Sequence, residues 1–193
     1  KTQGTLSFRE PFTLSTSTPI NAIDLSKIIL RNKDSVAIKF TANYDELNQE
    51  IRFDFNKEEE QKYTLELLPE ALTDFYEAKN DSLRFEANTK LLSDYGNLKV
   101  NLSGVKRFPI ILEVLDEKGT VLYSKASPKE TTLFFETIEP KLYTLRVIYD
   151  DNANGIWDTG DYLNKKQAEE ILYYPKLLDV RANWDVEQDF NLD

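Results

Sequence analysis

Between residues 150 and 161, oxygen-bearing groups recur at the spacing of a calcium-binding loop. Positions 1, 3, 5, 7, 9 and 12 of such a loop are filled here by Asp150, Asn152, Asn154, Ile156 (through its carbonyl), Asp158 and Asp161. Gly155 stands at position 6, where the chain must turn sharply. Calcium takes about six to eight oxygen ligands, and crowded carboxylates repel one another unless a cation lies among them. The sequence therefore predicts a calcium site formed by these six residues.

The segment differs from an EF-hand in two respects. Asp161 is one methylene shorter than the bidentate Glu of position 12. In residues 143–149, which lead into the loop, every second side chain from Tyr143 to Tyr149 is apolar and Thr144 and Arg146 lie between them, a pattern that predicts a strand instead of a helix. One alternative is a long hairpin turn in which Asn, Asp and Gly serve only as turn formers. Magnesium is an alternative ion, although the number of ligands favours the larger calcium.

The composition excludes several kinds of chemistry. The chain of 193 residues has no histidine and no cysteine, which rules out a serine triad, a histidine zinc site, a disulfide and a thiol nucleophile. Its net charge of −10 argues against nucleic acid or an anionic membrane surface as a partner. No stretch approaches the roughly 18 apolar residues of a membrane span. We therefore do not expect an enzyme or a transmembrane segment.

The first half of the chain consists of short alternating segments separated by polar turns. The predicted strands are residues 36–40, 51–55, 63–67 and 83–87. Residues 68–75 are the exception and predict a helical turn between two strands. Turn-like residues between 89 and 96 mark a boundary, which divides the chain into domains 1–92 and 93–193.

The second half has the same character with more strands. These are residues 98–102, 110–115, 120–123, 132–135, 143–149, 171–174 and 178–182, with a hairpin turn at 116–119. About seven strands in such a length are typical of an immunoglobulin-like or transthyretin-like sandwich. We expect an all-β protein with two Ig-like or transthyretin-like β-sandwich domains in tandem.

Residues 142–162 and 182–185 resemble the C-terminal part of Ig-like-domain lipoproteins of the Bacteroidota. Residues 5–89 resemble, more weakly, the bacterial Ig-like domain of surface-layer proteins. The lipoprotein resemblance implies a location at the outer membrane or cell surface, through a lipidated cysteine that we expect upstream of Lys1. It offers no catalytic residues to transfer.

The acidic loop is also similar to the loops of calcium-stapled sandwich repeats in cell-wall adhesins. This second resemblance implies ligand roles for Asp150, Asn152, Asn154, Asp158 and Asp161. The adhesin loops commonly end in Glu, and Asp161 departs from that pattern.

Aromatic side chains near the loop allow a second kind of function. Trp157 lies inside the loop and Trp184 in what we expect to be the closing strand, with Tyr162, Tyr173 and Tyr174 nearby in sequence. They could stack on a sugar ring, or they could simply pack. The expected function is a non-catalytic, calcium-stabilised module of a cell-envelope lipoprotein. The alternative is a glycan- or partner-protein-binding subunit of an outer-membrane complex.

Overall fold

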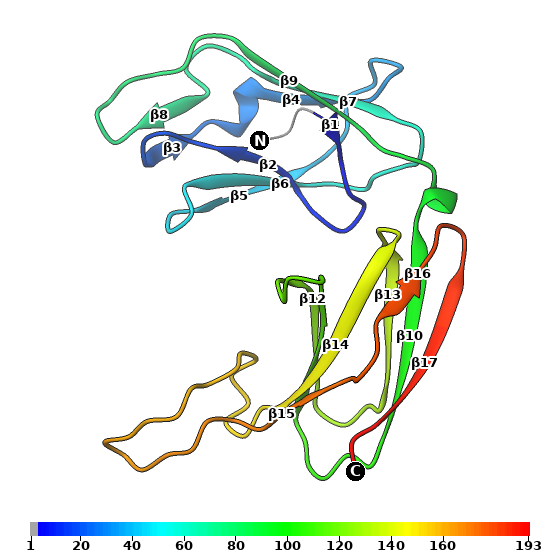
Figure 1. The fold of residues 1–193 in the computed structure, drawn as a ribbon. Coiled ribbons are helices and arrows are strands. Elements are labelled where there is room, and N and C mark those ends of the chain that lie inside the picture. Colours follow the sequence, from blue (N-terminus) through cyan, green and yellow to red (C-terminus); the bar gives the residue numbers. More distant parts are fainter. Residues whose placement is uncertain (1–3) are drawn as a thin grey trace. The chain divides into compact units, whose positions relative to one another are not determined.

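The computed structural model describes residues 4–193, and the chain divides into two compact units, Lys1–Leu91 (unit 1) and Leu92–Asp193 (unit 2). Both units are built of β-strands (Figure 1), with two short 3-10 turns, η1 (Leu25–Lys27) and η2 (Leu92–Asp94). The predicted all-β class with tandem sandwiches is therefore confirmed. Within residues 4–193, no helix has the length and apolar character needed to cross a membrane.

Unit 1 contains two main sheets and a small strand pair. The first sheet has the order β1 (Gly4–Thr5), β9 (Leu83–Asn88), β7 (Lys62–Leu67) and β4 (Ile28–Arg31). The second has the order β2 (Phe12–Ser15), β6 (Glu50–Asp54) and β5 (Thr41–Asp45). The pair consists of β3 (Ile20–Ile23) and β8 (Leu72–Asp74).

The core of unit 1 follows from strand alternation. On β7, Tyr63, Leu65 and Leu67 are almost completely buried, and on β6 the same is true of Ile51 and Phe53. These side chains belong to one apolar cluster, so the two sheets pack face to face. Because successive side chains point to opposite faces, the intervening residues of β7 lie on the outer surface of the sheet.

Unit 2 is a second sandwich. Strand β10 (Gly96–Ser103) lies between β13 (Thr132–Ile138) and β17 (Asp185–Asn191), the latter in parallel. The facing sheet has the order β12 (Val121–Ser127), β11 (Ile110–Leu115), β14 (Lys141–Tyr149) and β15 (Ile171–Tyr173), and β16 (Leu178–Val180) also pairs with β14. The alternate residues of β14 from Tyr143 to Tyr149 are fully buried, which anchors the start of the acidic loop in the core.

Two predicted segments are wrong. Residues 36–40 form no strand: Ala37 makes only an isolated bridge to Arg31, because the Asn32 side chain binds the backbone N–H of Val36 and curls the chain. The strand of this region is β5, a few residues later. Residues 68–75 contain β8 instead of a helical turn, since pairing with β3 satisfies the backbone in an extended form.

Trp184 was expected in the closing strand and instead precedes it. Asn183, with φ of 58°, turns the chain before β17 begins at Asp185. The backbone N–H of Trp184 donates to the carbonyl of Arg181 at 3.3 Å, as in a turn. This difference places the Trp184 side chain at the end of the sheet.

Candidate metal-binding loop

The acidic loop begins at Asp150, directly after β14, and its side chain is only 2% exposed. Asp150 Oδ1 accepts the backbone N–H of Asn154 at 3.1 Å, and Oδ2 accepts that of Gly155 at 2.9 Å. Gly155 has φ of +80°, which glycine adopts without steric strain. The Asp150 carboxylate therefore closes the turn by binding the backbone of Asn154 and Gly155.

Two asparagine side chains meet at the carboxylate of Asp158. The amide nitrogens of Asn152 and Asn154 both donate to Asp158 Oδ2, the second at 2.7 Å. The two amide oxygens accept backbone N–H groups, from Asn154 at 3.1 Å and from Ile156 at 2.9 Å. A half turn of each asparagine amide would exchange its oxygen and nitrogen. Both amide oxygens would then lie on the side of the Asp158 carboxylate, where the nitrogens lie now. The structure thus gathers Asn152, Asn154 and Asp158 within the turn that Asp150 closes.

Glu169 lies outside the loop in sequence, is 5% exposed, and binds the loop backbone at two residues. Its Oε1 accepts the backbone N–H of Asp151 at 2.9 Å, and its Oε2 accepts that of Asp158 at 3.0 Å. The Glu169 carbonyl accepts the indole N–H of Trp157 at 3.2 Å. A single buried carboxylate therefore fixes the backbone near both ends of the loop. Glu169 was not predicted as a site residue, because no spacing rule links it to the loop; its one sequence signal is an acidic pair directly before β15.

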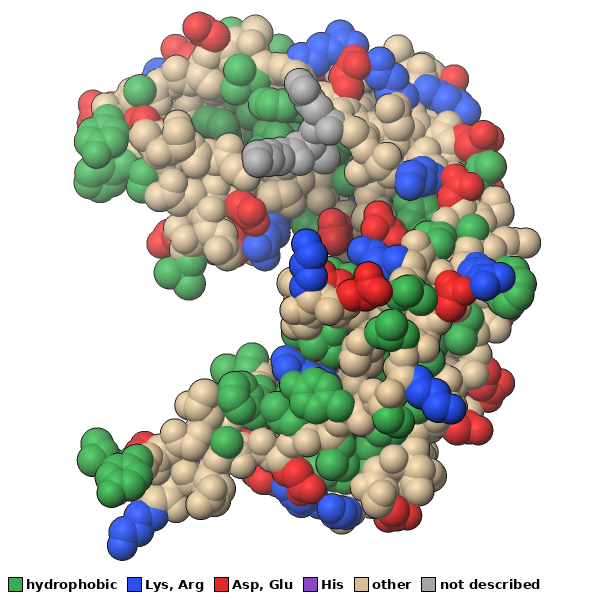
Figure 2. All heavy atoms as spheres, in the orientation of Figure 1, with side chains coloured by type: hydrophobic (Ala, Val, Ile, Leu, Met, Phe, Trp, Pro, Cys, Tyr) green, Lys and Arg blue, Asp and Glu red, His purple; other side chains and the backbone are tan. Residues whose placement is uncertain are grey.

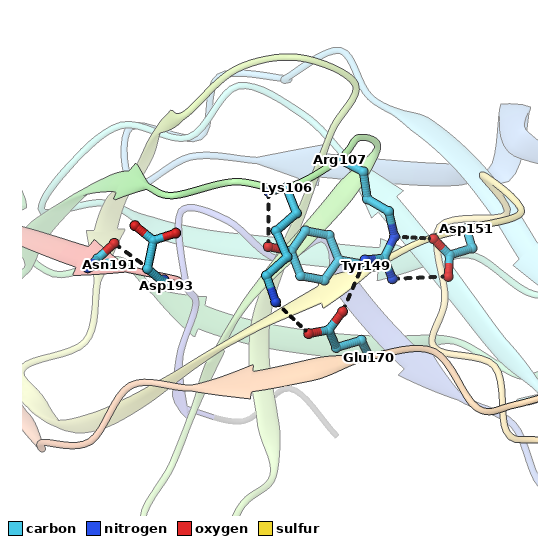
Figure 3. Close-up of polar contacts among 7 residues, drawn as sticks. All are labelled: Lys106, Arg107, Tyr149, Asp151, Glu170, Asn191 and Asp193. Atoms are coloured by element: carbon cyan, nitrogen blue, oxygen red, sulfur yellow. Dashed lines mark hydrogen bonds and ion pairs between the residues drawn. The ribbon is translucent and has the colours of Figure 1, made fainter.

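Arg107 forms a second brace at the base of the loop (Figure 3). Its guanidinium binds both carboxylate oxygens of Asp151, at 2.6 and 3.2 Å, and donates to Glu170 at 3.0 Å. The same group lies over the ring of Tyr149, 4.3 Å from its centre, and Lys106 also pairs with Glu170 at 3.2 Å. Hydrogen bonds from Arg107 lower the pKa of Asp151 and of Glu170. Arg107, like Glu169, was not predicted as a site residue.

Asp161 makes hydrogen bonds within the hairpin that follows the loop. It exchanges two backbone hydrogen bonds with Lys166, each 2.9 Å, within a hairpin that Figure 1 shows extending from unit 2. Its carboxylate accepts the backbone N–H of Asn164 at 3.0 Å and the side-chain amide at 2.7 Å, and these bonds lower the pKa of Asp161. The carboxylate of position 12 is thus engaged in a local turn.

The gathered groups are chemically suited to a hard cation. Two carboxylates and two amides are oxygen donors of the type that calcium takes. Each Asp150 oxygen already accepts one hydrogen bond, but an ionised carboxylate has about four acceptor positions in total, so both oxygens keep capacity. Ile156 lies between Asn154 and Asp158 in the turn. Within residues 4–193, no group of three or more acidic side chains is arranged so that it could hold a metal ion by itself.

The aromatic side chains named above have different surroundings. Trp157 is 39% exposed and tied to Glu169, whereas Tyr174 packs against Phe190 at 5.2 Å between ring centres. The more exposed ones are Tyr162 at 94%, Tyr173 at 58% and Trp184 at 57%. Tyr173 accepts a hydrogen bond from Arg146 at 3.3 Å, and the Arg181 guanidinium lies 5.2 Å from the centre of the Trp184 ring, so Tyr162 is the most exposed of the five.

Neither a protein-family model nor a curated protein matches the sequence. Among solved structures, the chain is similar to the major pilin subunit BcpA of Bacillus cereus, with 8% identity and a TM-score of 0.35 over 93% of this chain. It is also similar to the Bacillus anthracis TIE protein, with 11% identity and a TM-score of 0.32 over 98% of this chain. A third similarity is to the pullulanase SAP of Group B Streptococcus, with 9% identity and a TM-score of 0.28 over 79% of this chain.

The chain spans 55% of the length of that pilin subunit, 38% of the TIE protein and 22% of the pullulanase. The similarity is distant and concerns the arrangement of strands. It identifies neither a family nor a lineage.

Proposed function

We propose that the chain is a non-catalytic structural module of a bacterial cell envelope whose second sandwich is stabilised by calcium. The observation that carries the proposal is the meeting of Asn152, Asn154 and Asp158 inside the turn closed by Asp150. These four side chains and the Ile156 carbonyl are the ligands we propose. Asp161 is left out of the set, because its carboxylate binds Asn164.

Calcium would act on stability. The ion would replace the hydrogen bonds that the two asparagine amides now make to Asp158, and it would neutralise the carboxylates of Asp150 and Asp158. Extracellular calcium modules bind at about 10⁻⁴–10⁻³ M. At free calcium of roughly 100 times the dissociation constant, the native state would gain about 2.7 kcal/mol.

Terbium luminescence tests the site directly, because Trp157 lies in the loop and can sensitise a bound lanthanide. We expect terbium emission on tryptophan excitation, and we expect calcium to displace terbium at lower concentration than magnesium. Trp157→Phe should abolish the emission and leave calcium binding by calorimetry intact, whereas Trp184→Phe should preserve both. Emission that survives Trp157→Phe would place the ion elsewhere.

The envelope location rests on the resemblance of residues 142–162 to Bacteroidota lipoproteins. A lipid-anchored protein of this kind would carry its lipidated cysteine upstream of Lys1. Metabolic labelling of the natural protein with a palmitate analogue would test this: label in the membrane fraction supports the anchor. An unlabelled protein that remains in the aqueous fraction would contradict it.

A second candidate is binding of a glycan or a partner protein, as favoured by the apex of the hairpin between residues 159 and 168. Tyr162 and Leu163 are 94% and 90% exposed there, and Lys165 and Lys166 follow after Asn164. A glycan array and affinity capture from envelope extracts, each with Tyr162→Ala as the control, would separate this role from a purely structural one. Loss of a captured partner in the variant supports it; no partner in either assay favours the structural module.

A further inference from the structure

Four cationic side chains surround one hollow on the outer surface of unit 1. The hollow has a volume of about 350 Å³, and Arg31, Lys33, Lys62 and Arg84 line it. Residues 1–91 contain 12 lysines and arginines against 16 aspartates and glutamates, so a third of the cations of an acidic unit gather at this place. Figure 2 shows lysine and arginine side chains along the side of unit 1 where β4, β7 and β9 lie in Figure 1.

The hollow exists because a short residue is surrounded by long ones. Thr64 lies at the middle of the sheet, and the strand register places it between Arg31 of β4 and Glu86 of β9. Its neighbours Tyr63 and Leu65 point into the core, so Thr64 faces outward, yet it is only 8% exposed. Thr64 therefore forms the floor of the hollow, and the charged side chains form its wall.

The cations outnumber the carboxylates that pair with them. Glu66 and Glu86 make four ion pairs, which are Arg84–Glu86 (2.8 Å), Lys62–Glu86 (2.7 Å), Arg84–Glu66 (3.5 Å) and Arg31–Glu66 (3.8 Å). Lys33 Nζ donates to the backbone carbonyl of Glu60 at 3.5 Å. Of the residues that line the hollow, four are cations and one, Glu66, is a carboxylate, while Asp34 and Glu60 lie beside Lys33.

We propose that this hollow binds a phosphate or sulfate monoester group. Guanidinium groups bind such tetrahedral oxyanions in a fork, and ammonium groups bind them as point charges. Asn32, Ser35 and Thr64 also line the hollow and add neutral hydrogen-bonding groups. The net charge of −10 disfavours a long polyanion, so the ligand is a small phosphorylated or sulfated molecule such as a sugar ester. This site lies in unit 1 and is independent of the calcium loop in unit 2.

An NMR titration of backbone amides tests the proposal, with glucose 6-phosphate, glucose 6-sulfate, inorganic phosphate and inorganic sulfate as ligands at constant ionic strength. We expect saturable shifts confined to residues 31–35, 62–66 and 84–86. Tighter binding of the esters would identify a sugar-borne group, and equal binding of the inorganic ions would identify the free oxyanion as sufficient. Shifts no larger than those with sodium chloride, or spread over all exposed lysines, would overturn the proposal.

Two variants locate the site. Lys62 and Lys79 have side chains that are each 50% exposed and each pair with one glutamate, so Lys62→Gln and Lys79→Gln form a matched pair. Only Lys62→Gln should weaken binding, by about two- to fivefold. Thr64→Leu raises the floor without changing charge and should remove the saturable shifts, while circular dichroism shows an unchanged fold. Equal effects of the two lysine variants, or full binding by a folded Thr64→Leu protein, would contradict the site.

Discussion

Glu169 and Asp158 are joined by two hydrogen bonds that run in opposite directions. The backbone N–H of Asp158 donates to Glu169 Oε2 at 3.0 Å, and the backbone N–H of Glu169 donates to the carbonyl of Asp158 at 3.1 Å. Asp158 is therefore fixed through its backbone while its carboxylate receives the amides of Asn152 and Asn154. The position of the Asp158 carboxylate therefore depends on Glu169, which follows the hairpin at residues 159–168.

Replacing the buried carboxylate of Glu169 should therefore weaken unit 2. In Glu169→Gln, the amide oxygen can serve one backbone N–H, but the NH₂ group must face the other, and an unsatisfied buried donor costs about 1–3 kcal/mol. Urea denaturation followed by circular dichroism measures the loss. Glu170→Gln is the control, because its carboxylate lies nearer the surface, with 38% of the side chain exposed. Equal losses in the two variants would contradict a special role for Glu169.

Alanine variants of Gly155 and Gly119 distinguish an effect on protein stability from an effect on calcium binding, because both glycines have the same backbone conformation. Gly155 and Gly119 have φ of +80° and +82°, and an added Cβ would meet no atom within 4 Å at either position. Gly155→Ala and Gly119→Ala should each cost about 1 kcal/mol through backbone strain alone. In calorimetric titrations, only Gly155→Ala should weaken calcium binding. A similar loss of affinity in Gly119→Ala would show that the loop geometry does not control the ion.

The Arg107 brace predicts a specific dependence of stability on pH. Arg107 lowers the pKa of Asp151 and Glu170 in the folded protein, so their ionised forms stabilise it above the ordinary carboxyl pKa values of about 4. That stabilisation is lost as the pH falls through the lowered folded values. In Arg107→Gln, the melting temperature at pH 7 should fall and its decline below about pH 4 should become shallower.

The control for this prediction is Arg181→Gln, which removes an ion pair with Asp179 (2.7 Å) elsewhere in unit 2. Its melting curve should keep the decline of the unmodified protein. An equal fall in melting temperature between pH 7 and pH 3 for Arg107→Gln and the unmodified protein would contradict the role proposed for Arg107.

Strands with a regular apolar side could be predicted from the sequence, and polar ones could not. Strand β14 alternates from Tyr143 to Val147, where Thr144 and Arg146 separate buried apolar residues, and its prediction is confirmed. The closing strand, β17, was expected only around Trp184 and its bounds were not predicted, because Val186 and Phe190 are its only apolar residues. Its other side carries acids that bond to β10, as in the 2.7 Å contact of Asn97 with Asp185. Such polar ladders depend on which strands pair, and local periodicity does not contain that information.

The same distinction applies to the candidate site. Local spacing predicted a cluster, and the structure places Asp150, Asn152, Asn154 and Asp158 together because they share one tight turn. Glu169 and Arg107 come from distant parts of the chain and meet the loop only after β14 and β15 have paired, so no motif could identify them. The proposed ligand roles of the four residues stay a prediction.

The most direct test of the calcium proposal is the melting temperature of unit 2 in excess calcium and in excess EGTA. At free calcium of about 100 times the dissociation constant, we expect a rise of roughly 10 °C in the unmodified protein. Asp158→Ala should show no calcium-dependent rise, while Glu59→Ala, altered in unit 1, should show the full one. Identical melting temperatures of the unmodified protein in calcium and in EGTA would contradict the proposal that this loop binds a stabilising ion.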